Sequence, residues 1–134
     1  MTAIIWINEE DTILIHERLL ALNGGATGIR DYGLLQSALA RPQQLLNYTE
    51  NPTILELAAS YIVGLVKNHP FIDGNKRVGF GVGILFIEMN GYTFIASQTA
   101  AADAILAVAS GEMDETGIGL FLKQNCKLRF STLQ

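Results

Sequence analysis

Nine consecutive residues, 69–77, hold most of the side chains in this chain that could do chemistry together. They read His-Pro-Phe-Ile-Asp-Gly-Asn-Lys-Arg, which combines one imidazole, one carboxylate, one amide and two cations. His69 can take a proton near neutral pH, which is the work of a general base. Asp73 is a hard oxygen ligand of the kind that Mg²⁺ prefers. Together with Lys76 and Arg77, these residues predict phosphoryl or nucleotidyl transfer.

The turn at Asp73-Gly74-Asn75 is expected to start a helix, with Asn75 as its N-cap residue. The free N–H groups and the positive dipole end at a helix start bind phosphate readily. Gly74, Asn75, Lys76 and Arg77 are therefore predicted to anchor phosphate, Asn75 through its side-chain amide as well. Two cations on a first turn are unfavourable for the helix alone, because the dipole favours carboxylates there. Their position implies a bound anion.

Several of these residues also have a purely structural interpretation when they are taken one at a time. His69 could end a helix, Asp73 could serve only in the turn, and Lys67 is more simply a solvated cation than a phosphate ligand. Taken together, the residues of the nonapeptide favour the functional interpretation. His16 lies on an apolar stripe and is predicted to be a hydrogen-bonded core histidine without a catalytic role. Phe71 is predicted to anchor the loop in the core.

Composition limits the class of protein. The 134 residues are 49% hydrophobic and 16% charged, which predicts one folded domain over 1–134 that needs no disulfide. Cys126 is the only cysteine, so a cytoplasmic location is expected. The most apolar stretch, Val78–Met89, is too short to span a bilayer. The net charge of −4 argues against direct nucleic-acid binding, and Lys67, Lys76 and Arg77 form a focused anion site instead.

The spacing of apolar residues predicts an all-α fold. The expected helices run from Asn8 to about Leu22, from Asp31 to about Arg41-Pro42, from Asn51-Pro52 to about Asn68, from Asn75 to about Met89, from Ser97 or Gln98 to about Ala109, and from Asp114 to about Leu128. The helix that follows the nonapeptide is apolar on nearly all sides, which is typical of a helix at the centre of a bundle. Gly79 and Gly83 share one face of it and would let a neighbouring helix come close. Residues 43–50 show no strong period and are expected to form a surface loop.

The nonapeptide resembles the motif of the Fic/Doc family, H-P-F-x-(D/E)-G-N-(G/K)-R, with every fixed position filled in order. Lys76 makes it similar to the death-on-curing (Doc) toxin branch of that family. Residues 24–31, Gly-Gly-Ala-Thr-Gly-Ile-Arg-Asp, together with residues 34–42, resemble the N-terminal half of Doc-like proteins. The resemblance implies an all-α Fic/Doc-type bundle whose central buried helix follows the motif loop. It also assigns residues 43–50 to a flap that lays the target segment over the active site.

The resemblance further implies a reaction. ATP would be the substrate, His69 the base, Asp73 the Mg²⁺ ligand, and Lys76 and Arg77 part of the phosphate anchor. Adenylyl transferases of the Fic type usually have glycine in place of Lys76 and a second arginine three residues after Arg77, where this chain has Phe80. This difference favours the Doc-like outcome, transfer of the γ-phosphate to a hydroxyl of a translation factor. Elongation factor Tu is the implied target, and translation arrest the implied consequence.

Two other functions stay open at this point: a protein adenylyl transferase of the Fic type and a non-catalytic nucleotide-binding module. Some Fic proteins carry an internal inhibitory sequence, (S/T)-x-x-x-E-(G/N), which this chain lacks, because Leu46 stands four residues before Glu50-Asn51. The resemblance therefore implies a toxin with a separate antitoxin, whose C-terminal segment folds into a groove on the toxin.

Overall fold

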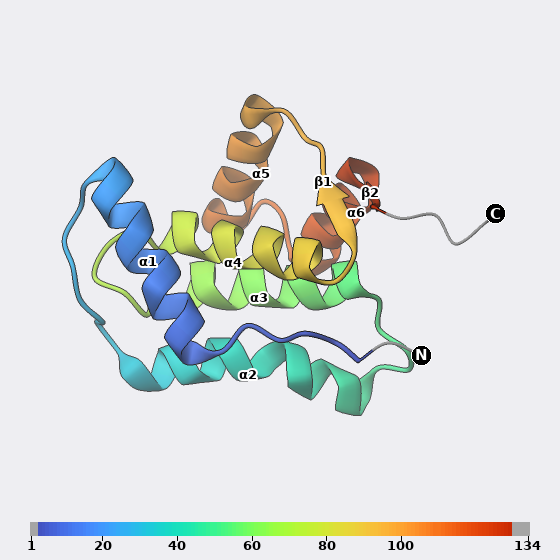
Figure 1. Cartoon of the computed structure of the whole chain (residues 1–134), viewed down its shortest axis with the longest axis horizontal. Coiled ribbons are helices and arrows are strands. Elements are labelled where there is room, and N and C mark those ends of the chain that lie inside the picture. The colour runs from blue at the N-terminus through green and yellow to red at the C-terminus, as the bar shows by residue number, and fades with distance from the viewer. Residues whose placement is uncertain (1–2, 130–134) are drawn as a thin grey trace.

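The computed structural model describes residues 3–129, which form six helices and one two-stranded sheet (Figure 1). In chain order the elements are α1 (Glu9–Asn23), α2 (Tyr32–Tyr48), α3 (Ile54–Asn68), α4 (Asn75–Met89), β1 (Tyr92–Phe94), α5 (Gln98–Ser110), α6 (Glu115–Asn125) and β2 (Cys126–Leu128). The predicted all-α class is confirmed for the body of the fold. The small sheet was not predicted.

Helices α3 and α4 lie side by side at the centre of the molecule, with α2 on one side and α5 and α6 on the other (Figure 1). The predicted close approach at Gly79 and Gly83 is confirmed. A Cβ atom on Gly79 would lie 2.8 Å from Cγ2 of Val66, and one on Gly83 would lie 2.6 Å from Cδ1 of Ile62. Because the two helices pack this closely, the loop that joins them is held at one end of the bundle.

Four helices start where the sequence predicts. The side chains of the N-cap residues Asn8, Asp31, Ser97 and Asp114 each accept a hydrogen bond from the backbone N–H three residues later. The predicted start of α3 at Asn51-Pro52 is wrong, because its N-cap is Thr53. Thr53 Oγ1 accepts from the Glu56 N–H at 3.1 Å, and Glu56 Oε1 accepts from the Thr53 N–H at 2.7 Å. This reciprocal pair satisfies two free donors.

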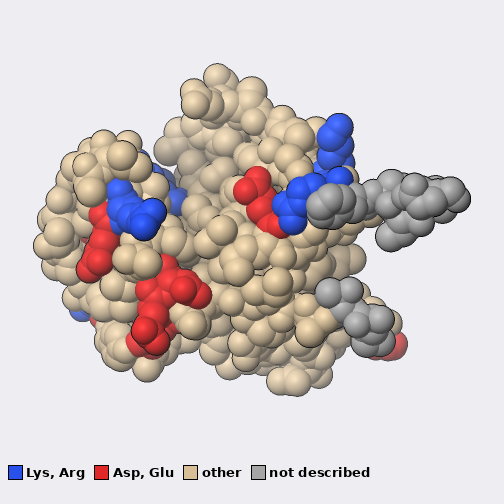
Figure 2. All heavy atoms as spheres, viewed as in Figure 1, with Lys and Arg blue, Asp and Glu red and all other residues tan. Residues whose placement is uncertain are grey.

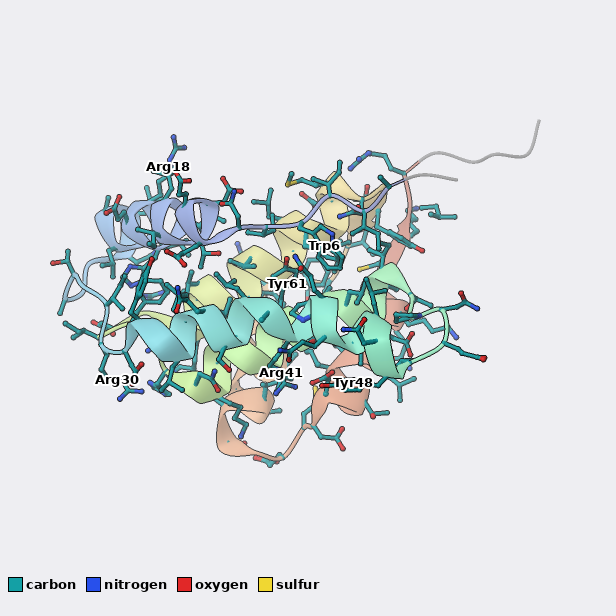
Figure 3. The ribbon with its side chains drawn as sticks, turned by 90° about the horizontal axis from the view of Figure 1, so that it is seen from below. Trp6, Arg18, Arg30, Arg41, Tyr48 and Tyr61 are labelled. Carbon is teal, nitrogen blue, oxygen red and sulfur yellow. The ribbon has the colours of Figure 1, made fainter. Side chains whose placement is uncertain are left out.

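The predicted end of α2 near Arg41-Pro42 is also wrong, because the helix continues to Tyr48 with Pro42 inside it. A proline in a helix interior costs about 3 kcal/mol. Pro42 is buried and Leu45 packs against the core, and this burial offsets the cost. Residues 43–48 are therefore helical, at the end of α2 opposite the loop between α3 and α4 (Figures 1 and 3). The loop prediction is wrong for residues 43–48, and the flap prediction is wrong because this segment lies away from the loop between α3 and α4.

The last helix is shorter than predicted. It ends at Asn125 instead of about Leu128, and Cys126–Leu128 form β2, which pairs antiparallel with β1. The register places Tyr92 opposite Leu128 and Phe94 opposite Cys126. A strand this short takes its conformation from its partner, which stands more than thirty residues earlier in the chain.

In the part of the chain that the structure describes, no helix is both long and apolar enough to cross a membrane.

The contact between α3 and α4 predicts opposite effects for two glycines of the same helix. Gly83→Ala should destabilise the protein by about 1–3 kcal/mol, because its Cβ would overlap the Ile62 side chain. Gly81→Ala should be neutral or stabilise by about 0.4–1 kcal/mol, because the nearest atom to its Cβ is Leu19 Cδ1 at 3.5 Å. Urea unfolding of the two variants measures the difference. Equal stabilities would contradict the close packing of α3 on α4.

Candidate active site

A cleft of about 690 Å³ opens at the end of the bundle where α3 passes into α4. Six of the residues predicted to form the site line it: His69, Asp73, Gly74, Asn75, Lys76 and Arg77. The rest of its wall is mainly apolar and comes largely from α4 and α5, including Phe80, Ile105 and Leu106. The cleft thus places one polar, cationic edge against an apolar wall.

Asn75 has a different local role from the predicted one. The N-cap of α4 is Gly74, with φ +79°, and no side chain caps this helix. The Asn75 side chain is buried and turns back into the loop, where Oδ1 accepts from the Phe71 N–H at 2.9 Å. Nδ2 donates to the Phe71 carbonyl at 2.9 Å and lies 3.1 Å from Nδ1 of His69. One amide therefore closes the loop and orients the imidazole.

His69 is the C-cap residue of α3 and adopts a left-handed conformation, with φ +51° and ψ +53°. This conformation costs a residue with a side chain about 1–2 kcal/mol. Backbone contacts on the next two residues offset this cost. The Pro70 carbonyl accepts from the N–H groups of Arg30, at 2.7 Å, and Asp31, at 3.0 Å. Phe71 forms a β-bridge with Ile29. The exposed His69 ring then faces the cleft that it lines.

Phe71 and His16 hold the loop between α3 and α4 against the core. Phe71 is buried, and its ring stacks on the His16 ring with centroids 3.8 Å apart. His16 is buried as well, and its Nε2 lies 2.7 Å from the backbone carbonyl of Asp73. These contacts confirm Phe71 as the anchor and His16 as a hydrogen-bonded core histidine. The His16 contact also fixes the position of the Asp73 backbone at the edge of the cleft.

The Asp73 carboxylate is exposed, and backbone groups hold both of its oxygens. Oδ2 accepts from the Ala26 N–H at 3.2 Å, and Oδ1 accepts from the Gly74 N–H at 2.8 Å. These two bonds, followed by the charge of Arg77, hold the pKa of Asp73 below its ordinary value. An ionised, fixed carboxylate suits a Mg²⁺ ion. Among the described residues no cluster of three metal-binding side chains exists, so such an ion would take its other ligands from phosphate oxygens and water.

Lys76 and Arg77 are exposed on the first turn of α4, and that turn contains no acidic residue. Within residues 3–129 neither side chain forms a direct ion pair, since the ion pair found there joins Arg41 to Glu115. The first intrahelical hydrogen bond is donated by Val78, so the N–H groups of residues 75–77 have no partner in the helix. The two cations and the three donors form a site suited to a polyphosphate.

Lys67 is the one predicted phosphate ligand that does not line the cleft. Its Nζ lies 3.6 Å from the position of a Cβ on Gly111, the C-cap residue of α5. On the face shown in Figure 2, charged groups are few, basic and acidic groups lie next to one another, and most of the surface is uncharged. This face of the molecule therefore carries no broad basic patch.

The sequence reasoning missed the contribution of residues 25–31, between α1 and α2. The Ala26 N–H holds Asp73, the Gly28 carbonyl accepts from the Ile72 N–H at 3.0 Å, and Arg30 contacts the residues around His69. The signal for this role was the run of glycines, which leaves room for close approach. A Cβ on Gly25, at φ +128°, would lie 2.8 Å from Oδ2 of Asp73.

This contact predicts that Gly25→Ala raises the pKa of Asp73, because the carboxylate must move away from the Ala26 N–H, the largest cause of its lowered pKa. Gly24→Ala is the matched control, since Gly24 also has a positive φ but a Cβ there would meet nothing within 4 Å. Carbon-detected NMR titration of the Asp73 carboxyl group measures both variants. An unchanged pKa in Gly25→Ala, or an equal rise in the two, would contradict the role of this loop.

Comparison with known proteins agrees with this geometry. Residues 6–87 match the model of the Fic/DOC family. The chain is 29% identical over 118 residues to the protein named "Protein kinase doc" of Escherichia phage P1, covering 88% of this chain and 93% of that protein. It is 35% identical over 94 residues to "Toxin Doc" of Mycolicibacterium smegmatis, covering 68% of this chain and 72% of that toxin. The family match covers the loop between α3 and α4, with α1 to α3 and most of α4, and the chain belongs to the Fic/DOC family.

Proposed function

We propose that this protein is the toxin of a toxin-antitoxin pair and transfers the γ-phosphate of ATP to a hydroxyl of a target protein. The observation that supports the proposal most is the position of the exposed Lys76 and Arg77 beside His69 and Asp73 on one cleft. The printed names of the two relatives, a protein kinase and a toxin, agree with this proposal.

The polar edge of the cleft supplies what a triphosphate needs. The N–H groups of residues 75–77 donate to phosphate oxygens, and Lys76 and Arg77 neutralise their charge. Asp73 is the residue that would hold Mg²⁺, which when bound would neutralise charge that develops on the phosphates. The apolar wall at Phe80, Ile105 and Leu106 excludes water from one side of the site, which strengthens these electrostatic contacts.

His69 acts as the base in this proposal. The target hydroxyl donates its proton to the His69 imidazole while its oxygen attacks the γ-phosphorus. The bond between the γ-phosphorus and the oxygen that bridges it to the β-phosphate breaks, and ADP leaves. The products are a phosphorylated protein, ADP and one proton. Before the proton is transferred, the Asn75 amide holds the ring through its contact with Nδ1 at 3.1 Å.

Phe80 favours phosphate transfer over AMP transfer. It lines the cleft one turn after Arg77 and packs edge-on against Phe94, with ring centroids 5.6 Å apart. No charge therefore stands where adenylyl transferases of the family usually have a second arginine. Without that arginine, the cationic edge consists of Lys76 and Arg77. A nucleotide bound in the direction opposite to that in adenylyl transferases then presents its γ-phosphate to His69. Adenylyl transfer is the alternative reaction of the same site.

The finer parts of the proposal rest on family resemblance. Elongation factor Tu is the proposed target, and the arrest of translation in the cytoplasm is the proposed consequence. A separate antitoxin, with a C-terminal segment that folds into a groove, is the proposed inhibitor.

Labelled ATP tests which phosphorus moves. We expect label from γ-labelled ATP on the target protein, and none from α-labelled ATP. His69→Ala is the control and should lower the rate by about 10²–10⁴-fold, which is the usual contribution of a general base. Label that arrives only from the α-position would establish adenylyl transfer instead. No label from either position, with ATP still bound, would establish a non-catalytic binding module.

Arg77→Ala tests the anion site without any turnover. The variant should bind ATP more weakly, yet its stability without nucleotide should be unchanged or higher by about 0.3–1 kcal/mol, because a cation leaves the positive end of a helix dipole. Arg18→Ala, which removes an exposed cation from α1, is the control and should leave ATP affinity unchanged. Calorimetric binding and urea unfolding measure the two effects. Lost stability with unchanged ATP affinity would contradict a phosphate role for Arg77.

A further inference from the structure

Arg30 makes more contacts to the start of the motif loop than its exposed position suggests. Its Nε donates to the His69 carbonyl at 2.7 Å, and its Nη2 donates to the Asn68 carbonyl at 2.9 Å. Its backbone N–H donates to the Pro70 carbonyl at 2.7 Å. One residue thus holds three consecutive carbonyls, with His69 in the middle.

These carbonyls need such a partner because of where they lie. Asn68 is the last residue of α3, so its carbonyl has no acceptor role within the helix, and His69 follows it in the left-handed conformation. The guanidinium places a positive charge at the negative end of the helix dipole, which strengthens both hydrogen bonds. Its planar fork also reaches two carbonyls at once, which an ammonium group cannot do in the same geometry.

We propose that Arg30 is the positioning residue of His69: it holds the histidine backbone in the left-handed conformation from which the imidazole reaches the cleft. The ring itself is held by Asn75, through Nδ1, so backbone and ring are fixed by two separate residues. Arg30 does not line the cleft and therefore acts on catalysis only through His69. The kinetic half of this proposal rests on the proposed role of His69 as base.

The kinetic test separates positioning from substrate binding. Arg30→Ala should lower kcat by about 10- to 100-fold, because a displacement of about 1 Å in a reacting group costs up to about 10²-fold in rate. The KM for ATP should stay within about twofold, since Arg30 touches no part of the cleft. Arg30→Lys restores the charge but not the fork and should give an intermediate kcat. Arg18 projects outward from α1, away from the other helices (Figure 3). Arg18→Ala should therefore leave both constants unchanged.

A second measurement needs no nucleotide. The chain has two histidines, so the ring signals of His69 are those that disappear in His69→Ala. In Arg30→Ala these ring signals should shift or broaden, and in Arg18→Ala they should match the wild type. Thermal unfolding of each variant shows that the compared proteins are folded at the temperature of the measurement.

The results distinguish the two proposals. If His69→Ala retains full transfer while Arg30→Ala disturbs the His69 ring signals, the base assignment is wrong and the positioning role of Arg30 stands. If the His69 ring signals of Arg30→Ala match those of the wild type, the positioning role is overturned. It is also overturned if Arg18→Ala lowers kcat as much as Arg30→Ala does, or if Arg30→Ala raises the KM for ATP without lowering kcat.

Discussion

The buried amide of Asn75 is the interaction on which the site depends. Two packed helices, α3 and α4, leave only residues 69–74 to reverse the chain, and the Asn75 side chain closes that turn with both of its functional atoms on Phe71. The remaining N–H of the same amide faces His69. A buried amide left without partners would cost about 1–3 kcal/mol, so the loop and the orientation of the histidine are stabilised together.

Two unfavourable features remain in the folded chain without ligand, and both lie on the cleft. His69 adopts a left-handed conformation, and Lys76 with Arg77 puts two cations at the positive end of a helix dipole. Backbone contacts from residues 28–31 and the close packing of α3 on α4 hold these features in place. Strain kept at a cleft in this way is a common property of sites that bind and react, because the conformation is ready before the ligand arrives.

The segment between α1 and α2 explains why the motif alone does not make the site. Ala26 holds the Asp73 carboxylate, and Arg30 holds the carbonyls around His69, although both stand about forty residues earlier in the chain. Glycine at position 25 is required because a side chain there would displace the carboxylate. The residues that do chemistry are thus local in sequence, while the residues that position them are not.

The sequence by itself determined the features that depend on neighbours a few residues away. Asn8, Asp31 and Asp114 start helices because each side chain bonds the N–H three residues later, and the apolar pattern of residues 75–89 marks a buried helix. The residues of the nonapeptide also indicated the cationic edge of the cleft. In each of these cases the physical cause lies within one or two helical turns.

Only the tertiary structure decided the rest. Burial carries α2 through Pro42, pairing with β1 turns Cys126–Leu128 into a strand, and the contacts of Asn75 with Phe71 and His69 outweigh the capping role that its residue type favours. Arg30 could be recognised as a partner of His69 only once α2 was packed against α3. These outcomes depend on contacts that form when distant segments meet, and a local pattern carries no information about them.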